Sequence, residues 1–378
     1  MKRFYNIIYP VIWKEFIHIR RDARTLAVLF LIPTGLMLLV GFVVNFDVSH
    51  IRLAVLDEDK TNQSRDFVQS FIHTEYFDYT YAAQNQNEID TLLDDGKIDG
   101  AIIIPQKFSD ALVKGQTSDV QVLVDGSNST TAPTMVGYIG GAITSYSAKL
   151  RTDAFLKMGI HEYAPVDFRP RAWYNPELST VKYLIPGLIG YVLMLTSVVA
   201  TAMSIVKEKE RATMEQIVVS SVSSFELIIG KLLPYLIIAM SSTAVLLLAS
   251  FVVFGVAIIG SLVWLFFSIL IFLVCALALG LWVSTISDSQ QVAFQISGLV
   301  STLPSVMLSG FIYPIRSMPV PVQIATNFTP VKFFIHAIRA IMLKGVGPFA
   351  FWQDWMAMVI FAAIVIGIST RRLQRQKL

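Results

Sequence analysis

Cysteine is nearly absent from this sequence, which contains a single one, Cys275, among its 378 residues. A chain with one cysteine forms no internal disulfide, so any domain outside the cytoplasm must be held by a hydrophobic core of its own. Cys275 lies inside an apolar run, where a free cysteine usually packs as a small hydrophobic residue. We therefore expect neither thiol chemistry nor a cysteine-bound metal.

Charged residues are also few, since Asp, Glu, Lys and Arg make up 15% of the chain and hydrophobic residues 54%. This balance is typical of a membrane protein. A helix needs about 20 apolar residues to cross a hydrocarbon layer of roughly 30 Å. Apolar runs of this kind occupy residues 25–46, 183–206, 232–256, 262–285, 292–315 and 352–370. The sequence therefore predicts an α-helical polytopic membrane protein with six transmembrane helices.

Two patterns that would give the chain its own energy source are missing. The phosphate-binding loop GxxxxGKS/T does not occur, so we expect no ATP and no other cofactor to bind this chain. The apolar runs carry no ionisable residue away from their ends, whereas an ion-coupled carrier normally uses one to bind its ion. Backbone carbonyls can also bind sodium, so ion-coupled transport stays open as an alternative. A transporter of this composition otherwise needs a separate motor.

Basic residues are concentrated at the two ends of the chain. Residues 1–24 and 371–378 are strongly basic, whereas the long polar region 47–181 is acidic. Short segments rich in Lys and Arg stay in the cytoplasm, so both termini are predicted inside and region 47–181 outside. Apolar residues at helical spacing in residues 1–24 predict an amphipathic helix in the cytoplasmic interface. Because the basic residues flank the spans, we expect no nucleic-acid binding.

Region 47–181 alternates strand patterns with helix patterns, which predicts an α/β domain inserted between the first and second transmembrane helices. Strands are expected at 51–56, 77–82, 99–105 and 120–124, and helices at 61–73, 88–95, 108–114 and about 131–158. Four aspartates of this region, Asp94, Asp95, Asp99 and Asp125, lie beside glycines or in turns, where Asp makes local hydrogen bonds. We interpret them as turn residues rather than as a metal or acid–base site.

Residues 207–231, KEKERATMEQIVVSSVSSFELIIGK, form a charge-dense segment between two long apolar runs. Its basic residues place this loop on the cytoplasmic side. Helical spacing predicts one helix over 207–219, and the capping-box spacing of Ser223 and Glu226 predicts a second over 225–231. We interpret the segment as a docking element for a soluble partner, and a solvated helix–turn–helix linker is the alternative.

Residues 316–350, between the fifth and sixth apolar runs, combine several prolines with a row of basic residues that we call the basic stripe. Lys332, His336 and Arg339 lie on one helix face, which a transmembrane helix does not tolerate near its middle. We therefore predict short re-entrant or interfacial helices at the outer end of the bundle. A seventh span through 331–342 is the alternative.

Three segments resemble one family, the ABC-2-type exporter permeases. KEKERATMEQIVVSSVSSFELIIGKLLPY resembles the loop after their second span, WKEFIHIRRDARTLAVLFLIP their entry helix, and LSGFIYPIRSMP with TPVKFFIHAIRAIMLKG their outer short helices. The resemblance implies that the charged loop docks on a separate ABC ATPase subunit, which holds the ATP and Mg. The residues expected to couple the loop to that ATPase are Lys207, Glu208, Glu210, Arg211, Glu215, Gln216, Glu226 and Lys231.

The resemblance further implies a function: the non-enzymatic permease subunit of a drug-export-like ABC exporter in the bacterial inner membrane, moving an amphipathic or hydrophobic substrate. Expected partners are a second permease in a homodimer or heterodimer, membrane lipid and a periplasmic adaptor protein. Export of a lipid-linked glycan or envelope component is one alternative, and a non-transporting sensor with an external ligand-binding domain is another.

No residue is assigned to the substrate path. Small and polar residues of the second and fifth spans allow helix backbones to approach closely, and this packing role is favoured over substrate contact. They are Gly187, Gly190, Thr196, Ser197, Ser297, Gly298, Ser301, Thr302 and Ser305.

Overall fold

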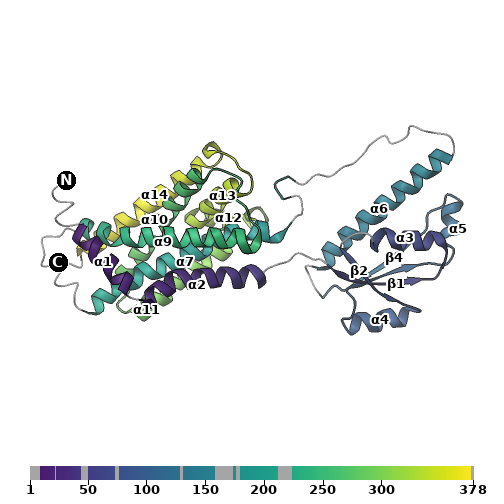
Figure 1. The fold of residues 1–378 in the computed structure, drawn as a ribbon, viewed down its shortest axis with the longest axis horizontal. Helices are drawn as coiled ribbons and strands as arrows, with labels where there is room; N and C mark the ends of the chain where they lie inside the picture. Colours follow the sequence, from purple (N-terminus) through teal and green to yellow (C-terminus); the bar gives the residue numbers. More distant parts are fainter. Residues whose placement is uncertain are drawn as a thin grey trace. The chain divides into compact units, whose positions relative to one another are not determined.

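The computed structural model forms two compact units, which are described separately (Figure 1). The helical unit comprises Met1–Asn45 and Ala172–Leu378, and the α/β unit comprises Phe46–Arg171. The structure describes residues 9–21, 23–43, 50–72, 76–127, 131–157, 173–175, 179–211 and 224–375.

The helical unit is a bundle whose long helices are apolar enough to cross a membrane. Its helices are α1 Tyr9–Arg21, α2 Ala23–Val43, α7 Thr180–Glu210, α9 Ser224–Phe254, α10 Leu262–Ile286, α11 Gln290–Met307, α12 Val320–Ala325, α13 Pro330–Met342 and α14 Trp352–Arg375. Within the described ranges, α7, α9, α10 and α14 are long and apolar enough to span. The chain is therefore a polytopic membrane protein. Helices α2 and α11 coincide with two further predicted spans, and the count of six stays a prediction.

The predicted helices beside the charged segment and at the fifth span can be compared with the structure. Helix α7 ends at Glu210 with Arg211 as its cap, and residues 212–219, for which helical spacing predicts a continuation, lie outside the described part of the chain. The helix predicted over 225–231, leading into the third span, coincides with the start of α9, which continues into that span without a break. Helix α11 stops at Met307 rather than at residue 315, because Gly310 adopts a φ of 76° that ends regular helix.

Helix α7 is the central helix of the bundle, because it packs against α2, α9, α10, α11 and α13. Its approach to α10 depends on Gly280, where an added Cβ would lie 2.7 Å from the Val198 carbonyl oxygen. The buried residues of α11 form one stripe along its main neighbour, α7. They are Ala293, Ser297, Ser301 and Ser305. The glycines of α7 have other neighbours: an added Cβ at Gly187 would lie 2.5 Å from the Phe311 ring, and one at Gly190 would lie 3.1 Å from the Phe334 ring of α13.

Helix α13 lies at the opposite end of the bundle from α1 (Figure 1). At 13 residues it extends about 20 Å, too short for a seventh span. Its basic residue Arg339 donates to the carbonyl oxygens of Tyr183 (3.2 Å), Gly310 (2.9 Å) and Phe311 (3.1 Å). The guanidinium also stacks 3.8 Å from the centre of the Tyr183 ring. Arg339 therefore joins the start of α7 to the turn after α11.

The other two basic residues of α13 also have partners. Lys332 donates to Asn327 Oδ1 at 2.6 Å and to Thr326 Oγ1 at 3.0 Å. His336 Nδ1 lies 2.6 Å from Asp354 Oδ2, in the first turn of α14. The hydrogen bond to Asp354 raises the pKa of His336 above its ordinary value, and burial opposes it more weakly. The basic stripe thus serves to fix α13 to its neighbours.

The α/β unit has a four-stranded sheet in the order β2-β1-β3-β4. Its elements are β1 Ile51–Asp57, α3 Asn62–Ile72, β2 Phe77–Ala82, α4 Gln86–Asp94, β3 Gly100–Ile104, α5 Phe108–Val113, β4 Gln121–Val124 and α6 Thr131–Lys157. Strand β1 pairs in parallel with β2 and β3, and β4 is antiparallel to β3. Helices α3 and α6 cover one face and α4 the other, each over its own apolar cluster (Figure 1).

Of the four aspartates predicted to make local turn contacts, Asp99 instead pairs with Arg52, 47 positions away in the chain, and the others lie in a turn or at the end of α4. Asp99 accepts two hydrogen bonds from the Arg52 guanidinium, at 2.8 and 3.1 Å, and these overcome the effect of burial and lower the pKa of Asp99. Asp125 accepts from the Ser127 amide at 2.9 Å, as a turn residue does. Asp95 caps α4 and pairs with Lys97 at 2.8 Å, and Asp94 is the last residue of that helix.

The His336–Asp354 pair predicts a pH-dependent stability. Because the pKa of His336 is raised in the folded protein, the pair stabilises the fold fully below about pH 6.5, the ordinary histidine value. The contribution is lost as the pH rises through the higher pKa of the folded state. The melting temperature of the full chain in detergent should therefore fall between pH 6 and pH 8, and His336→Gln should flatten this fall. An equal fall in the variant would contradict the prediction.

Candidate functional site

The charged last turn of α7 contacts two other helices through one carboxylate. Glu208 forms an ion pair with Lys231 of α9 and accepts from Lys14 of α1, with 3.4 Å between Lys14 Nζ and Glu208 Oε1. Lys231 Nζ also lies 3.9 Å from Glu15 Oε1. Two ammonium groups and two carboxylates thus join α1, α7 and α9. We call Lys14, Glu15, Glu208 and Lys231 the ion cluster.

Two of these four charged side chains, Glu15 and Lys231, are buried, and Glu208 is partly buried. The exposed fractions of the side chains are 4% for Lys231, 7% for Glu15 and 15% for Glu208, whereas Lys14 is 56% exposed. A buried charge without an opposite charge nearby costs several kcal/mol, of the order of 3 to 5, so each of these groups depends on the others. The ion cluster therefore holds the three helices in one arrangement.

The next two residues of α7 contact the connection between α10 and α11. Lys209 Nζ lies 3.1 Å from both the Ser287 carbonyl oxygen and Asp288 Oδ1. Glu210 accepts from the backbone amide of Gln290 at 2.7 Å and from its side-chain amide. A carboxylate is favoured there, because the first amides of a helix point outward and attract negative charge. The end of α7 is thus attached to α11 as well.

An apolar cluster also includes residues near the end of α7 and the start of α9. Ile205 of α7, Ile228 of α9, Leu281 of α10 and Leu373 of α14 are buried together, with Leu232 packed against them. Burying each such side chain contributes roughly 1.5 to 3 kcal/mol. The end of α7 and the start of α9, which flank residues 212–223, are therefore fixed by both polar and apolar contacts.

The structure brings together some of the residues expected to couple to an ATPase. Glu208 and Lys231 meet in the ion cluster, and Lys231 is too buried to offer a surface to another protein. Arg211 is exposed, and its amide donates to the Lys207 carbonyl oxygen at 3.2 Å. Glu226 lies in the first turn of α9. Glu215 and Gln216 lie outside the described residues. Their coupling role stays a prediction.

Four residues of the site escaped the sequence analysis: Lys14, Glu15, Asp288 and Gln290. Lys14 and Glu15 stand in a segment where periodicity indicates only an amphipathic helix. Their partners are about 200 positions away, with Lys14 and Glu208 separated by 194 residues. One sequence feature points to these contacts. Lys14 and Glu15 stand just before an apolar run, and a charge that becomes buried there needs an opposite charge on a neighbouring helix.

Comparisons with known proteins agree on one family. The model of the family described as ABC-2 family transporter protein matches residues 24–371. The probable multidrug ABC transporter permease YbhS of Escherichia coli strain K12 is 30% identical over 365 residues, which cover 96% of this chain and 95% of that protein. YbhR of the same strain, named likewise, is 27% identical over 359 residues, covering 95% and 96%. ABC transporter G family member 20 of Dictyostelium discoideum is 23% identical over 384 residues, covering 96% of this chain and 51% of that protein.

The ion cluster predicts unequal effects of two similar substitutions in the last turn of α7. Glu208→Gln leaves the buried Lys231 without its nearest opposite charge and should lower the free energy of unfolding by about 3 kcal/mol. Glu210→Gln removes an exposed carboxylate and should change the stability much less. Melting of the purified chain in detergent measures both variants. Equal melting temperatures would show that the ion cluster does not hold the helices.

Proposed function

The chain belongs to the ABC-2 family of transporter proteins, and on this premise we propose that it is the permease subunit of an ATP-driven exporter. The observation that carries the proposal is the match to two permeases named as multidrug ABC transporters over nearly the full length of each. The long apolar helices of the helical unit support the same role. The proposed substrate is amphipathic or hydrophobic and moves outward across the bacterial inner membrane.

A separate ABC ATPase would supply the energy. The sequence has no phosphate-binding loop, so ATP and Mg would be held by that partner. The proposed docking element is residues 207–231, between α7 and α9. Both flanking helix ends are attached to the bundle through the ion cluster and the Glu210–Gln290 contacts. A force applied to this element would therefore reach α1, α7, α9 and α11 together.

The proposed assembly contains two permeases, each with an ATPase bound. One strain of Escherichia coli has two different permeases similar to this chain, YbhS and YbhR, which supports pairing with a sister permease as well as with a second copy. Both termini would lie in the cytoplasm, since residues 1–24 and 371–378 are strongly basic. The α/β unit would lie outside, within reach of a periplasmic adaptor protein.

Arg211 offers a test of docking that leaves the ion cluster intact. Arg211→Glu reverses an exposed charge at the end of α7 and should reduce at least tenfold the ATPase recovered with the permease from its native host. Arg371→Glu is the matched control, because Arg371 is an exposed arginine near the end of α14. Recovery is measured as vanadate-sensitive ATP hydrolysis per permease after gentle detergent extraction.

Three outcomes are informative. Loss of ATPase from Arg211→Glu but not from Arg371→Glu supports docking at the end of α7. Normal recovery with both variants places the contact elsewhere. Recovery of the unmodified permease alone, with no ATP hydrolysis, contradicts the ATP-driven mechanism and favours the sensor or ion-coupled alternatives.

A further inference from the structure

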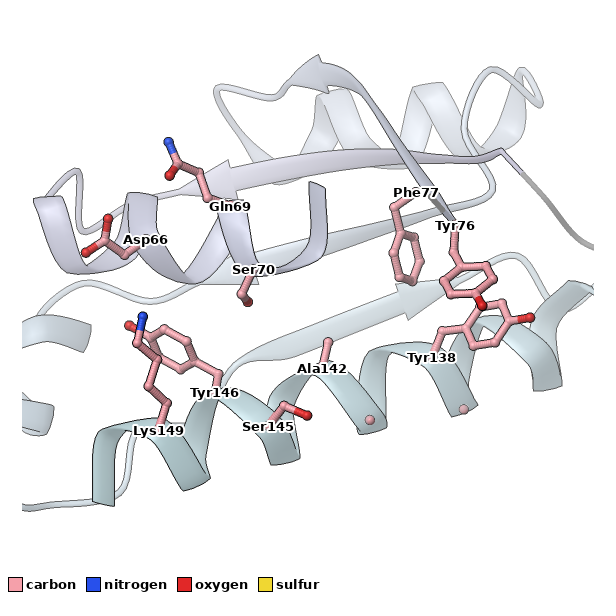
Figure 2. Close-up of a pocket in the computed structure, with 12 residues that line it drawn as sticks. Asp66, Gln69, Ser70, Tyr76, Phe77, Tyr138, Ala142, Ser145, Tyr146 and Lys149 are labelled. Carbon is pink, nitrogen blue, oxygen red and sulfur yellow. The ribbon is translucent and has the colours of Figure 1, made fainter. Parts of the chain in front are cut away.

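The α/β unit contains a groove that the proposed export function does not use. It lies between α3, the start of β2 and α6, and its volume is about 640 Å³ (Figure 2). Small-molecule sites in proteins usually measure about 300 to 1,000 Å³. The groove lies wholly within one compact unit. It is therefore large enough for a molecule of several rings.

One end of the groove is aromatic. The rings of Tyr76 and Tyr138 stack with their centres 4.3 Å apart, and Phe77 meets Tyr138 edge to face at 6.4 Å. Figure 2 shows these three side chains grouped at the same end. Tyr76 is 46% exposed, whereas Tyr138 is half-buried. The exposed Tyr76 ring offers a flat surface on which another planar ring can stack.

The other end carries polar and charged side chains. Asp66 and Gln69 extend from α3, and Lys149 extends from α6 on the opposite side of the groove (Figure 2). No ion pair involves Asp66 or Lys149 among the residues that the structure describes. A few polar groups beside an aromatic surface are the usual composition of a site that orients its ligand. The groove is thus aromatic at one end and polar at the other.

Two glycines of α6, Gly137 and Gly141, line the groove. An added Cβ at Gly137 or Gly141 would meet no atom within 4 Å in the described structure. Other helical glycines that do not line the groove, such as Gly140 and Gly298, have equally open surroundings, so the open space does not indicate a ligand. At Gly137 and Gly141 the missing side chain leaves the surface of α6 accessible from the groove.

We propose that this groove binds a planar, aromatic, amphipathic small molecule. Its ring system stacks at the Tyr76–Tyr138 pair and passes over Gly141, and its charged or polar end lies between Asp66 and Lys149. The site is separate from the helical unit and does not depend on the direction or energy source of transport. It makes the α/β unit a ligand-binding domain of the permease.

Matched substitutions on α6 test this site in the full chain. Gly141→Leu fills the groove, whereas Gly140→Leu adds the same side chain at a neighbouring position that does not line it. An added Cβ meets nothing within 4 Å at either position, so both variants should fold. The probe is proflavine, a water-soluble planar aromatic cation. Its binding to the chain in lipid nanodiscs is followed by fluorescence anisotropy.

We expect the unmodified chain and Gly140→Leu to bind proflavine with the same Kd, and Gly141→Leu to raise the Kd at least tenfold. Asp66→Asn should weaken binding of this cation, whereas Lys149→Gln should not. Equal affinity in the two glycine variants would place the probe elsewhere, for example in the helical unit, and overturn the proposal. Absence of saturable binding by the unmodified chain would overturn it as well. Neither result bears on ATPase recovery, so the export function is judged separately.

Discussion

The ion pair between Glu208 and Lys231 determines how α1, α7 and α9 of the helical unit meet. A charge that is removed from water must be close to an opposite charge, and this requirement brings α9 against the end of α7 and α1 against both. Arg339 obeys the same rule at the other end, where three backbone carbonyl oxygens replace the missing carboxylate. Between these points the helices meet through apolar and small side chains, such as Gly280 of α10 against α7, so buried charges and close packing together specify which helix contacts which.

The sequence predicts the helices of this unit well, because the thickness of the bilayer dictates the length of each apolar run. It misplaces the end of α11, because hydropathy continues past Met307 while the backbone turns at Gly310. Contacts between residues that are far apart in the chain cannot be predicted from the sequence pattern. Glu208 appears as one charge in a polar loop, and nothing local shows that it faces Lys14 and Lys231 rather than a partner protein. The burial of the Glu208 side chain indicates that it contacts Lys14 and Lys231 rather than a partner protein, and burial can be seen only in the folded bundle.

In the α/β unit, short apolar runs and helical spacing predict the four strands and four helices. Strand β3, for example, is a continuous apolar run that is buried along its whole length. The groove was not predicted, because α3 and α6 are far apart in the chain and their separation depends on how both pack on the sheet. Gly137 and Gly141 line it, but helical glycines with equally open surroundings also occur away from it, at Gly140 and Gly298. A glycine in a helix has several causes, and the structure is needed to see that no neighbour occupies the space beside these two.

Helix α7 has 31 residues and therefore measures about 46 Å from Thr180 to Glu210. A polar contact holds it near each end, through the Tyr183 carbonyl and Arg339 on one side and through Glu208 and Lys231 on the other. A continuous helix changes its length very little, so α7 keeps these two contacts at a constant distance from each other. If the end at Glu208 moves along the helix axis by an ångström, the hydrogen bond between Arg339 and Tyr183 cannot stretch far enough to follow. Any displacement of the end at Glu208 must therefore appear as a tilt, or as an exchange of partners at Arg339.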